Sequence, residues 1–217
     1  IKKGIRFDKW SKNIFYQIFR QSHYDYAFHF DSHLVGTYLK SIAKARGVKH
    51  IIGDVISLEG EKNINKVTLK KNQQINTDFI FDCTGFAKLV TGKHFKQKWT
   101  SSSKYLNANA AITFSLPVSK IIKENYTNAL RTKNGWIWNI PLKDRVGCGY
   151  VYSDIKIKDS TIKEEIFKLY GTKVEIGRKI KFEPGYFNKP WINNTIAVGL
   201  SSSFFEPLQA TSISVAV

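Results

Sequence analysis

The sequence predicts a mixed α/β fold. A helical periodicity covers residues 31–47, and an apolar strand at 78–85 breaks at a glycine, as a buried parallel strand does where it opens into a ligand crevice. From residue 109 onward, runs rich in β-branched and aromatic residues alternate with glycine and proline, which is typical of antiparallel sheet. No repeat and no flexible linker separates these regions, so we expect them to share one core.

The clearest helix is predicted at residues 31–47. Its apolar residues recur with the period of an α-helix and share one face, namely Leu34, Val35, Tyr38, Leu39, Ile42 and Ala43. Asp31 is the predicted N-cap, and Gly47 follows as a C-terminal stop. A second helix is predicted at about 160–170, where Thr161 to Glu164 has the form of a capping box.

Strands are predicted in both halves of the chain. The first half has candidates at 48–57, 66–70 and 79–83, with the polar segment 71–74 as a turn. The second half has candidates at 110–114, 135–140, 147–153, 178–182 and 195–200. The last of these is expected to be buried and to lead through residues 201–208 into a helix that starts near Gln209.

Composition excludes several classes of protein. With 217 residues, 42% of them hydrophobic, the chain can bury a core and is neither disordered nor collagen-like. No apolar run approaches the roughly 18 residues of a membrane helix, and no signal peptide opens the sequence, so we expect no membrane partner. Two cysteines, Cys83 and Cys148, suit a reducing compartment, and we expect a cytoplasmic protein.

The net charge of +17 raises the question of nucleic acid. The lysines are scattered along the chain, and no helix-turn-helix, zinc-finger or RNA-recognition motif occurs. We interpret the charge as a lysine-rich surface and expect no specific nucleic-acid partner. Non-specific, salt-sensitive binding would follow from the charge alone, so only a sequence-specific site would support a nucleic-acid-binding function.

Three local features could bind a ligand. The helix start near Gln209 offers unpaired N–H groups that suit a phosphate, a flavin carbonyl or a halide, although an ordinary capped helix has the same pattern. Trp136 and Trp138 would lie on one face of a strand, as a wall found both in cores and beside planar ligands. Gly85, after a buried strand, lets a ligand approach the backbone.

Other chemistries have weaker support. The five histidines lie apart and no Cys/His spacing indicates a metal site, so none is predicted. Cys83 has no cation beside it in sequence that would activate its thiol. The segment that begins at Gly199 lacks the second glycine of a serine-hydrolase elbow.

Five segments, in this order, resemble the flavin-dependent tryptophan halogenase family. They are Phe30-Asp31-Ser32-His33-Leu34-Val35, Phe81-Asp82-Cys83-Thr84-Gly85, Gly135-Trp136-Ile137-Trp138-Asn139-Ile140-Pro141, Gly149-Tyr150-Val151-Tyr152-Ser153 and Gly199-Leu200-Ser201-Ser202-Ser203-Phe204-Phe205-Glu206-Pro207-Leu208. Five ordered matches are far more specific than any one of them.

The resemblance implies an FAD-dependent monooxygenase-like fold, in which a Rossmann-type cofactor domain is interleaved with an antiparallel substrate sheet. Residues 1–108 would belong to the FAD-binding domain, 109–190 to the substrate sheet, and 191–217 to the FAD-binding domain again, with the halide and flavin loop. The family's G-x-G-x-x-G start and C-terminal helical part have no counterpart here. Because the sequence also lacks methionine and stops in an apolar stretch, we expect a chain that is incomplete at both ends.

The resemblance also implies a reaction. In the family, reduced FAD from a separate flavin reductase and oxygen convert halide to hypohalous acid, which travels through a tunnel to an electron-rich aromatic ring. Trp136 and Trp138 would form a wall beside the flavin, and the backbone amides of Thr211 and Ser212 would hold chloride or bromide. The positions that match contacts to the cofactor are Val55, Gly85, Leu200, Pro207 and Ile213.

The sequence departs from the family at three places. The catalytic glutamate of the family falls at Gln209, which cannot exchange a proton but can orient the halogenating species by hydrogen bonding. The interval between residues 4–10 and Phe30 is short, which favours another indole- or phenol-like substrate over free tryptophan. The tunnel lysine would precede Ile1. The alternative is a related FAD-dependent monooxygenase or a member of the family that has lost halogenation.

Overall fold

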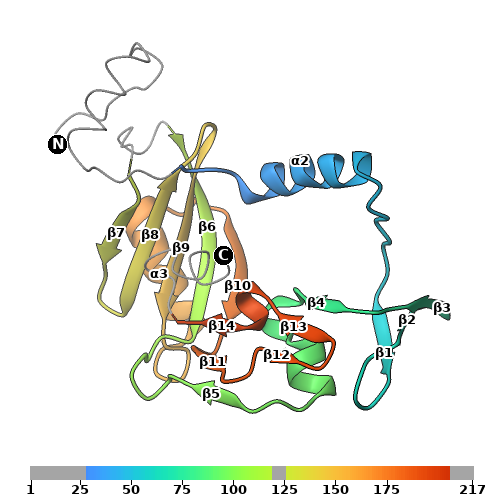
Figure 1. Cartoon of the computed structure of the whole chain (residues 1–217). Helices are drawn as coiled ribbons and strands as arrows, with labels where there is room; N and C mark the ends of the chain where they lie inside the picture. Colours follow the sequence, from blue (N-terminus) through green and yellow to red (C-terminus); the bar gives the residue numbers. More distant parts are fainter. Residues whose placement is uncertain (1–27, 119–125, 206–217) are drawn as a thin grey trace, which may run out of the picture.

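The structure, a computed structural model, describes residues 28–118 and 126–205, in which the strands form four sheets (Figure 1). The α-helices of this part are α2 (Ser32–Ala45) and α3 (Asp159–Tyr170). Shorter helical turns are η2 (Gly85–Ala87), η3 (Leu89–His94), which is a π-helix, and η5 (Gly199–Ser201). The mixed α/β architecture agrees with the fold class predicted from the sequence.

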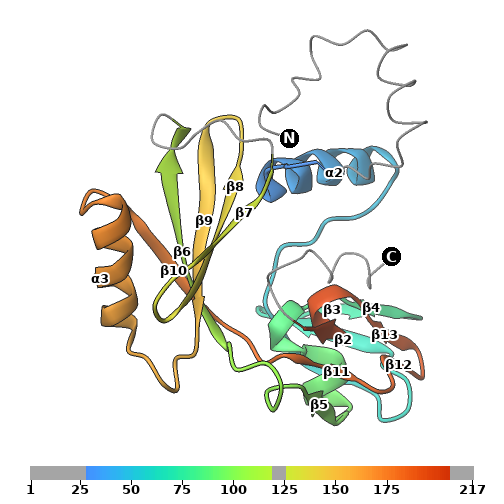
Figure 2. The same cartoon turned by 90° about the vertical axis from the view of Figure 1, so that its left-hand side faces the viewer.

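The largest sheet has five strands in the order β10-β6-β9-β8-β7, and all neighbours are antiparallel. Its strands are β6 (Ala110–Pro117), β7 (Asn128–Arg131), β8 (Gly135–Pro141), β9 (Arg145–Tyr152) and β10 (Ile176–Lys181). Strands at four of these five positions were predicted, and β7 was not. Figure 2 shows that α3 covers one face of this sheet, while the other face is on the side of the smaller sheets.

Alternation along the strands divides the core into two clusters. The cluster beneath α3 contains Ile112, Ile137 and Tyr150 from the sheet and Ile162 from the helix, with alternate residues of the same strands. Burying each such aliphatic side chain contributes about 1.5–3 kcal/mol. The second cluster lies on the opposite face and joins the large sheet to the smaller ones, so the single shared core predicted from the sequence is in fact two clusters.

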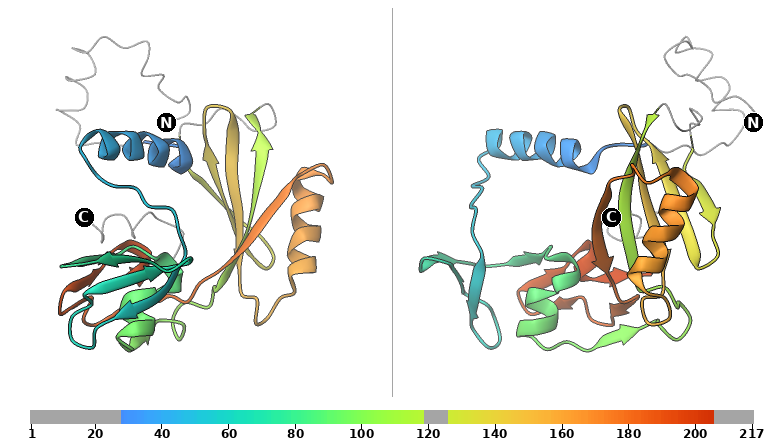
Figure 3. Two further views of the ribbon diagram at one scale, coloured as in Figure 1. Left: turned by 90° about the vertical axis from the view of Figure 1, so that its right-hand side faces the viewer. Right: turned by 180° about the vertical axis from the view of Figure 1, so that it is seen from behind.

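Three small sheets complete the described chain, as Figure 3 shows from two further sides. One contains β1 (Val55–Glu59), β2 (Lys66–Leu69) and β3 (Gln73–Asn76). The second contains β5 (Trp99–Ser101), β11 (Gly185–Phe187) and β14 (Ser203–Phe204). The third, in the order β12-β13-β4, contains β4 (Ile80–Asp82), β12 (Trp191–Ile192) and β13 (Thr195–Ala197), and its β13–β4 pair is parallel.

Helix α2 begins where the sequence predicts. The carboxylate of Asp31 accepts hydrogen bonds from the backbone N–H groups of His33 and Leu34 at 2.8 and 3.2 Å, which satisfies the free N–H groups of the first turn. The predicted apolar face is not buried, however, because no residue of α2 is buried among the described residues. No helix in the described part of the chain is long and apolar enough to cross a membrane.

The first three-stranded sheet differs from the prediction. The strand predicted at 48–57 is confined to β1, because its antiparallel ladder with β2 starts only at the Val55–Leu69 pair. Lys71 and Asn72 adopt φ angles of 75° and 61°, and this left-handed turn brings Gln73 back to pair with Leu69. The predicted turn at 71–74 is therefore shorter, and β3 follows it without having been predicted.

Of the two strands of the parallel pair, β13 is buried as predicted, with Thr195 and Ala197 at most 5% exposed, whereas β4 is less buried than predicted. Phe81 of β4 is 68% exposed, and β4 is the outer strand of its described sheet. The strand predicted at 195–200 ends at Ala197 and gives way to η5. The parallel orientation of the 79–83 strand itself is confirmed.

Helix α3 begins earlier than predicted. Its N-cap is Lys158, whose side chain makes no capping hydrogen bond, and Asp159 is its first residue. Thr161 therefore lies inside the helix, and the predicted capping box is wrong. The acidic Asp159 in the first turn suits the positive end of the helix dipole, and its carboxylate accepts a hydrogen bond from the Tyr152 hydroxyl at 2.6 Å.

A charge network ties the end of β9 to β10. The Nζ atom of Lys179 lies 2.8 Å from Asp154 and 2.7 Å from Asp159, and Lys181 lies 3.0 Å from Asp154. The side chain of Asp154 is only 10% exposed, and it also accepts a 2.7 Å hydrogen bond from Asn109. The hydrogen bonds from Lys179 and Lys181 hold the pKa of Asp154 well below its usual value of 3.8.

We expect Asp154→Asn to lower the free energy of unfolding by about 1–3 kcal/mol near pH 7. Because the pKa of Asp154 is lowered by folding, its contribution is present above the unfolded pKa and is lost as the pH falls below about 4. When the pH is lowered from about 5 to about 2, the free energy of unfolding measured with urea should therefore fall less for the variant than for the wild type. Glu61→Gln, at an exposed position, is the control; equal acid sensitivity of Asp154→Asn and wild type would contradict the prediction.

Candidate functional site

The two tryptophans of β8 form a wall on the sheet face opposite α3. Trp136 and Trp138 alternate with the buried Ile137, and their ring centroids lie 6.1 Å apart with the planes inclined at 61°. The shared face predicted from the sequence is therefore present. Gly149 pairs with Trp138 across the β8–β9 ladder, and a Cβ atom at 149 would overlap the indole ring. Glycine at this position lets the Trp138 ring lie flat on β9.

The second core cluster brings the tryptophan wall and Leu200 to one place. Its buried members are Ala111, Val151, Phe182 and Phe204, and the residues packed against them are Phe86, Ala108, Trp136, Trp138, Ile180 and Leu200. These residues come from widely separated parts of the sequence. The cluster thus assembles three of the predicted site residues on the open side of the large sheet.

Gly85 is linked to the segment that contains Leu200. Its N–H group donates a 2.7 Å hydrogen bond to Oγ of Ser201, which is fully buried. Gly85 and Gly199 have φ angles of 63° and 62°, and no atom lies within 4 Å of a Cβ atom built on either residue. Two backbone segments with open space beside them therefore lie next to one another.

A buried carboxylate shapes the segment before η3. Asp82 is 1% exposed, and its Oδ1 atom accepts hydrogen bonds from the hydroxyl and N–H of Thr84 at 2.6 and 3.2 Å. Its Oδ2 atom accepts from the N–H groups of Thr91 and Val90 at 2.9 and 3.3 Å. Because these bonds replace water around the charge, they fix the path of the chain on both sides of Gly85.

Val55 lies apart from the tryptophan wall. It lines a mostly apolar cavity of about 420 Å³, together with residues of β2, β3 and β4 and with Thr84. Thr84 directly precedes Gly85, so this cavity reaches the residue next to the Gly85 segment. The structure does not bring Val55 into the cluster with Leu200.

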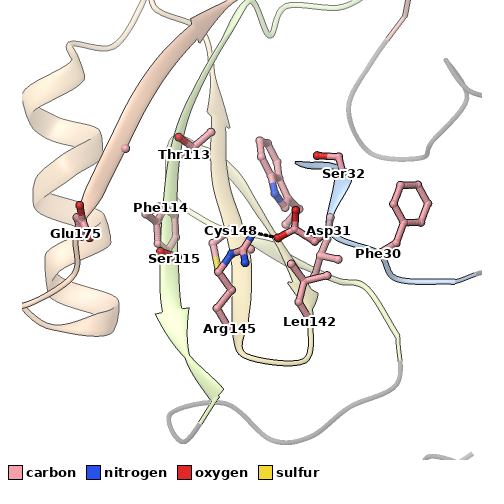
Figure 4. A pocket seen from close by; sticks show the side chains of 14 residues that line it. Phe30, Asp31, Ser32, Thr113, Phe114, Ser115, Leu142, Arg145, Cys148 and Glu175 are labelled. Atoms are coloured by element: carbon pink, nitrogen blue, oxygen red, sulfur yellow. Dashed lines mark hydrogen bonds and ion pairs between the residues drawn. The ribbon is translucent and has the colours of Figure 1, made fainter. Parts of the chain in front are cut away.

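A larger cavity of about 460 Å³ lies on the same face of the large sheet as the tryptophan wall (Figure 4). Trp138, Phe30 and Thr113 are among its lining residues. Arg145 and Asp31 form a 2.5 Å ion pair in it, and the hydrogen bond from Arg145 holds the pKa of Asp31 below its usual value. Trp138 therefore contributes both to this cavity and to the cluster that contains Leu200.

Five predicted site residues lie outside the described part of the chain. They are Pro207, Gln209, Thr211, Ser212 and Ile213. Among the described residues, no group of three or more metal-ligating side chains occurs. Both cysteines are free thiols, Cys83 exposed and Cys148 buried, and burial raises the pKa of Cys148 to about 12.

Sequence reasoning did not identify the roles of Asp82, Ser201 and Arg145. The motif that contains Asp82 was used for its strand, its glycine and its family resemblance, and no role was assigned to the carboxylate, although an acid at the end of a buried strand needs nearby donors. The Gly85–Ser201 bond joins residues 116 positions apart, and the Arg145–Asp31 pair joins residues 114 apart. Periodicity within a short window carries no information on such distant pairs.

The chain belongs to the tryptophan halogenase family, because the sequence model of that family matches residues 6–217. It is 32% identical over 200 residues to the tryptophan 6-halogenase SttH of Streptomyces toxytricini. This match covers 89% of this chain and 38% of SttH. It is also 32% identical over 197 residues to the tryptophan 7-halogenase RebH of Lentzea aerocolonigenes. That match covers 87% of this chain and 37% of RebH.

The fold agrees with solved structures of this family. A flavin-dependent halogenase from Xanthomonas campestris superposes with a TM-score of 0.83 at 28% identity, over 90% of this chain and 40% of that one. The predicted family resemblance and the FAD-dependent monooxygenase-like fold class are confirmed. The chain spans about two-fifths of the length of these relatives.

We expect Ser201→Ala to lower the free energy of unfolding by about 1 kcal/mol, because the partly buried N–H of Gly85 loses its acceptor. Hydrogen exchange at the Gly85 amide should become faster in the same variant. Ser202→Ala is the matched control, since the hydrogen bonds of Ser202 in this region are made by its backbone. Unchanged exchange at Gly85 in Ser201→Ala would show that the bond does not hold the two segments together.

Proposed function

We propose that this chain forms part of a flavin-dependent halogenase that acts on an electron-rich, indole- or phenol-like aromatic substrate. The observation that carries the proposal is the position of Trp138. On one side it packs against the cluster that includes Leu200, close to the Gly85 and Gly199 segments, and on the other it lines the 460 Å³ cavity. Such a wall suits an enzyme that keeps its cofactor apart from its aromatic substrate.

The described residues fit one side of a flat aromatic cofactor such as FAD. Gly85 and Gly199 leave open space beside the backbone, which a planar ring could approach without meeting a side chain. Leu200 and Trp136 add apolar surface next to them. When bound, reduced FAD would supply two of the four electrons that reduce oxygen to water, and the other two would come from oxidation of the halide. We assign Val55, Pro207 and Ile213 as further cofactor contacts on the family resemblance.

The chain's own residues would bind and separate the reactants. The backbone amides of Thr211 and Ser212 would hold chloride or bromide at a helix start, and Gln209 would orient the halogenating species by hydrogen bonds. Trp136 and Trp138 would keep the arene from the cofactor. Over one cycle, FADH2, oxygen, halide, a proton and the arene would give FAD, the haloarene and two molecules of water.

The organisation of the chain follows from the same proposal. Residues 1–108 and 191–217 would belong to the cofactor-binding domain, and 109–190 to the substrate sheet. A separate flavin reductase would supply FADH2. We place the reaction in the cytoplasm, since both cysteines are free thiols.

A related FAD-dependent monooxygenase, or a member that no longer halogenates, is the second candidate. It is favoured by Gln209, which stands where the family has a glutamate and cannot transfer a proton. The experiment that separates the candidates supplies the protein that carries this chain with FADH2, oxygen, bromide or chloride, and indole or phenol. Mass spectrometry then detects a haloarene in the first case and only a hydroxylated arene, or no product, in the second.

We expect Gln209→Glu to raise the halogenation rate about tenfold or more, because a carboxylate adds proton transfer to hydrogen bonding. The rate of haloarene formation at saturating halide measures this change. Gln209→Asn, which keeps an amide and shortens the side chain, is the matched control and should give no gain. An unchanged rate in Gln209→Glu would favour the monooxygenase candidate.

A further inference from the structure

The indole of Trp138 occupies the space that a side chain at position 149 would need. Trp138 of β8 pairs with Gly149 of β9. A Cβ atom built on Gly149 would lie 2.0 Å from Cζ2 and 2.2 Å from Cη2 of the indole. Carbon atoms in contact are normally about 3.5–4.0 Å apart. The indole ring therefore lies directly over the backbone of β9, at a place that only glycine leaves free.

The backbone at Gly149 does not itself require glycine. Neither Gly149 nor Gly147, two residues earlier on the same face of β9, has a positive φ angle, so the backbone at both positions suits any L-residue. The nearest atom to a Cβ atom built on Gly147 is the carbonyl oxygen of Ile140, at 3.9 Å. Alanine thus fits at 147 without moving a neighbour, whereas at 149 it meets the indole.

A side chain at 149 would displace the indole toward the 460 Å³ cavity. The backbone of β9 lies beneath the ring, the Trp136 ring centroid lies 6.1 Å away, and the cluster that contains the buried Val151 and Phe204 packs against Trp138. The cavity, which Trp138 also lines, is the neighbour that has room. Small-molecule sites range from about 300 to about 1,000 Å³, so this cavity is near the small end and would be narrowed appreciably.

We propose that Gly149 is a positioning residue that sets the width of this cavity, and with it the size of the aromatic ring system that the protein accepts. Gly149 does not line the cavity and acts through Trp138. Glycine keeps the indole against β9, which leaves room for a fused two-ring arene, and a larger residue would favour a single ring. The inference rests on the proposed function, because it assigns the cavity to the arene.

A purely structural role for Gly149 leads to a different expectation. If the glycine served only the packing of Trp138 into the cluster, its replacement would lower stability and weaken the binding of large and small arenes alike. A change in the ratio of two dissociation constants, one for a large and one for a small arene, requires that the indole moves into the space of the ligand. That ratio is therefore the quantity to measure.

The test measures, by calorimetry and without turnover, how the protein that carries this chain binds phenol and 1-naphthol, which differ by one fused ring. We expect Gly149→Ala to weaken 1-naphthol binding about tenfold or more and phenol binding less than about twofold, because lost space affects the larger ligand most. Gly147→Ala, the same substitution on the same face of β9, is the matched control and should leave both dissociation constants within about twofold.

Trp138→Val tests the same wall with Gly149 kept, and it serves where Gly149→Ala does not fold by circular dichroism. Removal of the indole widens the cavity, so the preference for 1-naphthol over phenol should rise about threefold or more. In the Trp138→Val background, Gly149→Ala should leave the ratio unchanged, because the ring atoms that it meets are gone.

An equal ratio of the two dissociation constants in Gly149→Ala and wild type, or in Trp138→Val and wild type where only that variant folds, would overturn the inference. So would a wild-type protein that binds neither arene. Haloarene formation is assayed separately by mass spectrometry. A protein that shows the expected change in ratio but forms no haloarene would keep this inference and contradict only the proposed function.

Discussion

One buried carboxylate determines the path of the chain through the candidate site. Asp82 stands at the end of β4 and makes its four hydrogen bonds with Thr84, Val90 and Thr91, with no ion pair to it among the described residues. A buried charge without such donors would be costly, so the backbone of residues 84–91 must curl around it. Gly85 is thereby held where its N–H reaches Ser201, and the two glycine segments become one surface.

The large sheet supplies the opposite wall through strand alternation. Ile137 points to α3, so Trp136 and Trp138 must point to the other face, where the second core cluster lies. Gly149 is the one position on the paired part of β9 that must lack a side chain for the Trp138 ring to lie there. The position of the tryptophan wall thus follows from the pairing register of β8 and β9 and from the glycine at 149, not from the tryptophan side chains themselves.

The sequence predicted local structure well and long-range structure poorly. Periodicity and the Asp31 cap located α2, and alternation placed both tryptophans on one face, because these signals lie within a few residues. The extent of β1 and the exposure of Phe81 depend on which partner strands are present, which no local pattern records. The Gly85–Ser201 bond depends on the complete fold for the same reason.

Helix α2, like β4, has apolar side chains that stay exposed in the described structure. Its start is fixed locally, because Asp31 caps the first turn and is itself paired with Arg145 of β9. Its apolar face has no cover in the described structure, and Leu34 is 67% exposed. Helix α2 and strand β4 therefore both leave apolar side chains exposed in the described part of the chain. The tryptophan wall differs from these two elements, because the cluster that Trp136 and Trp138 pack against lies within the described residues.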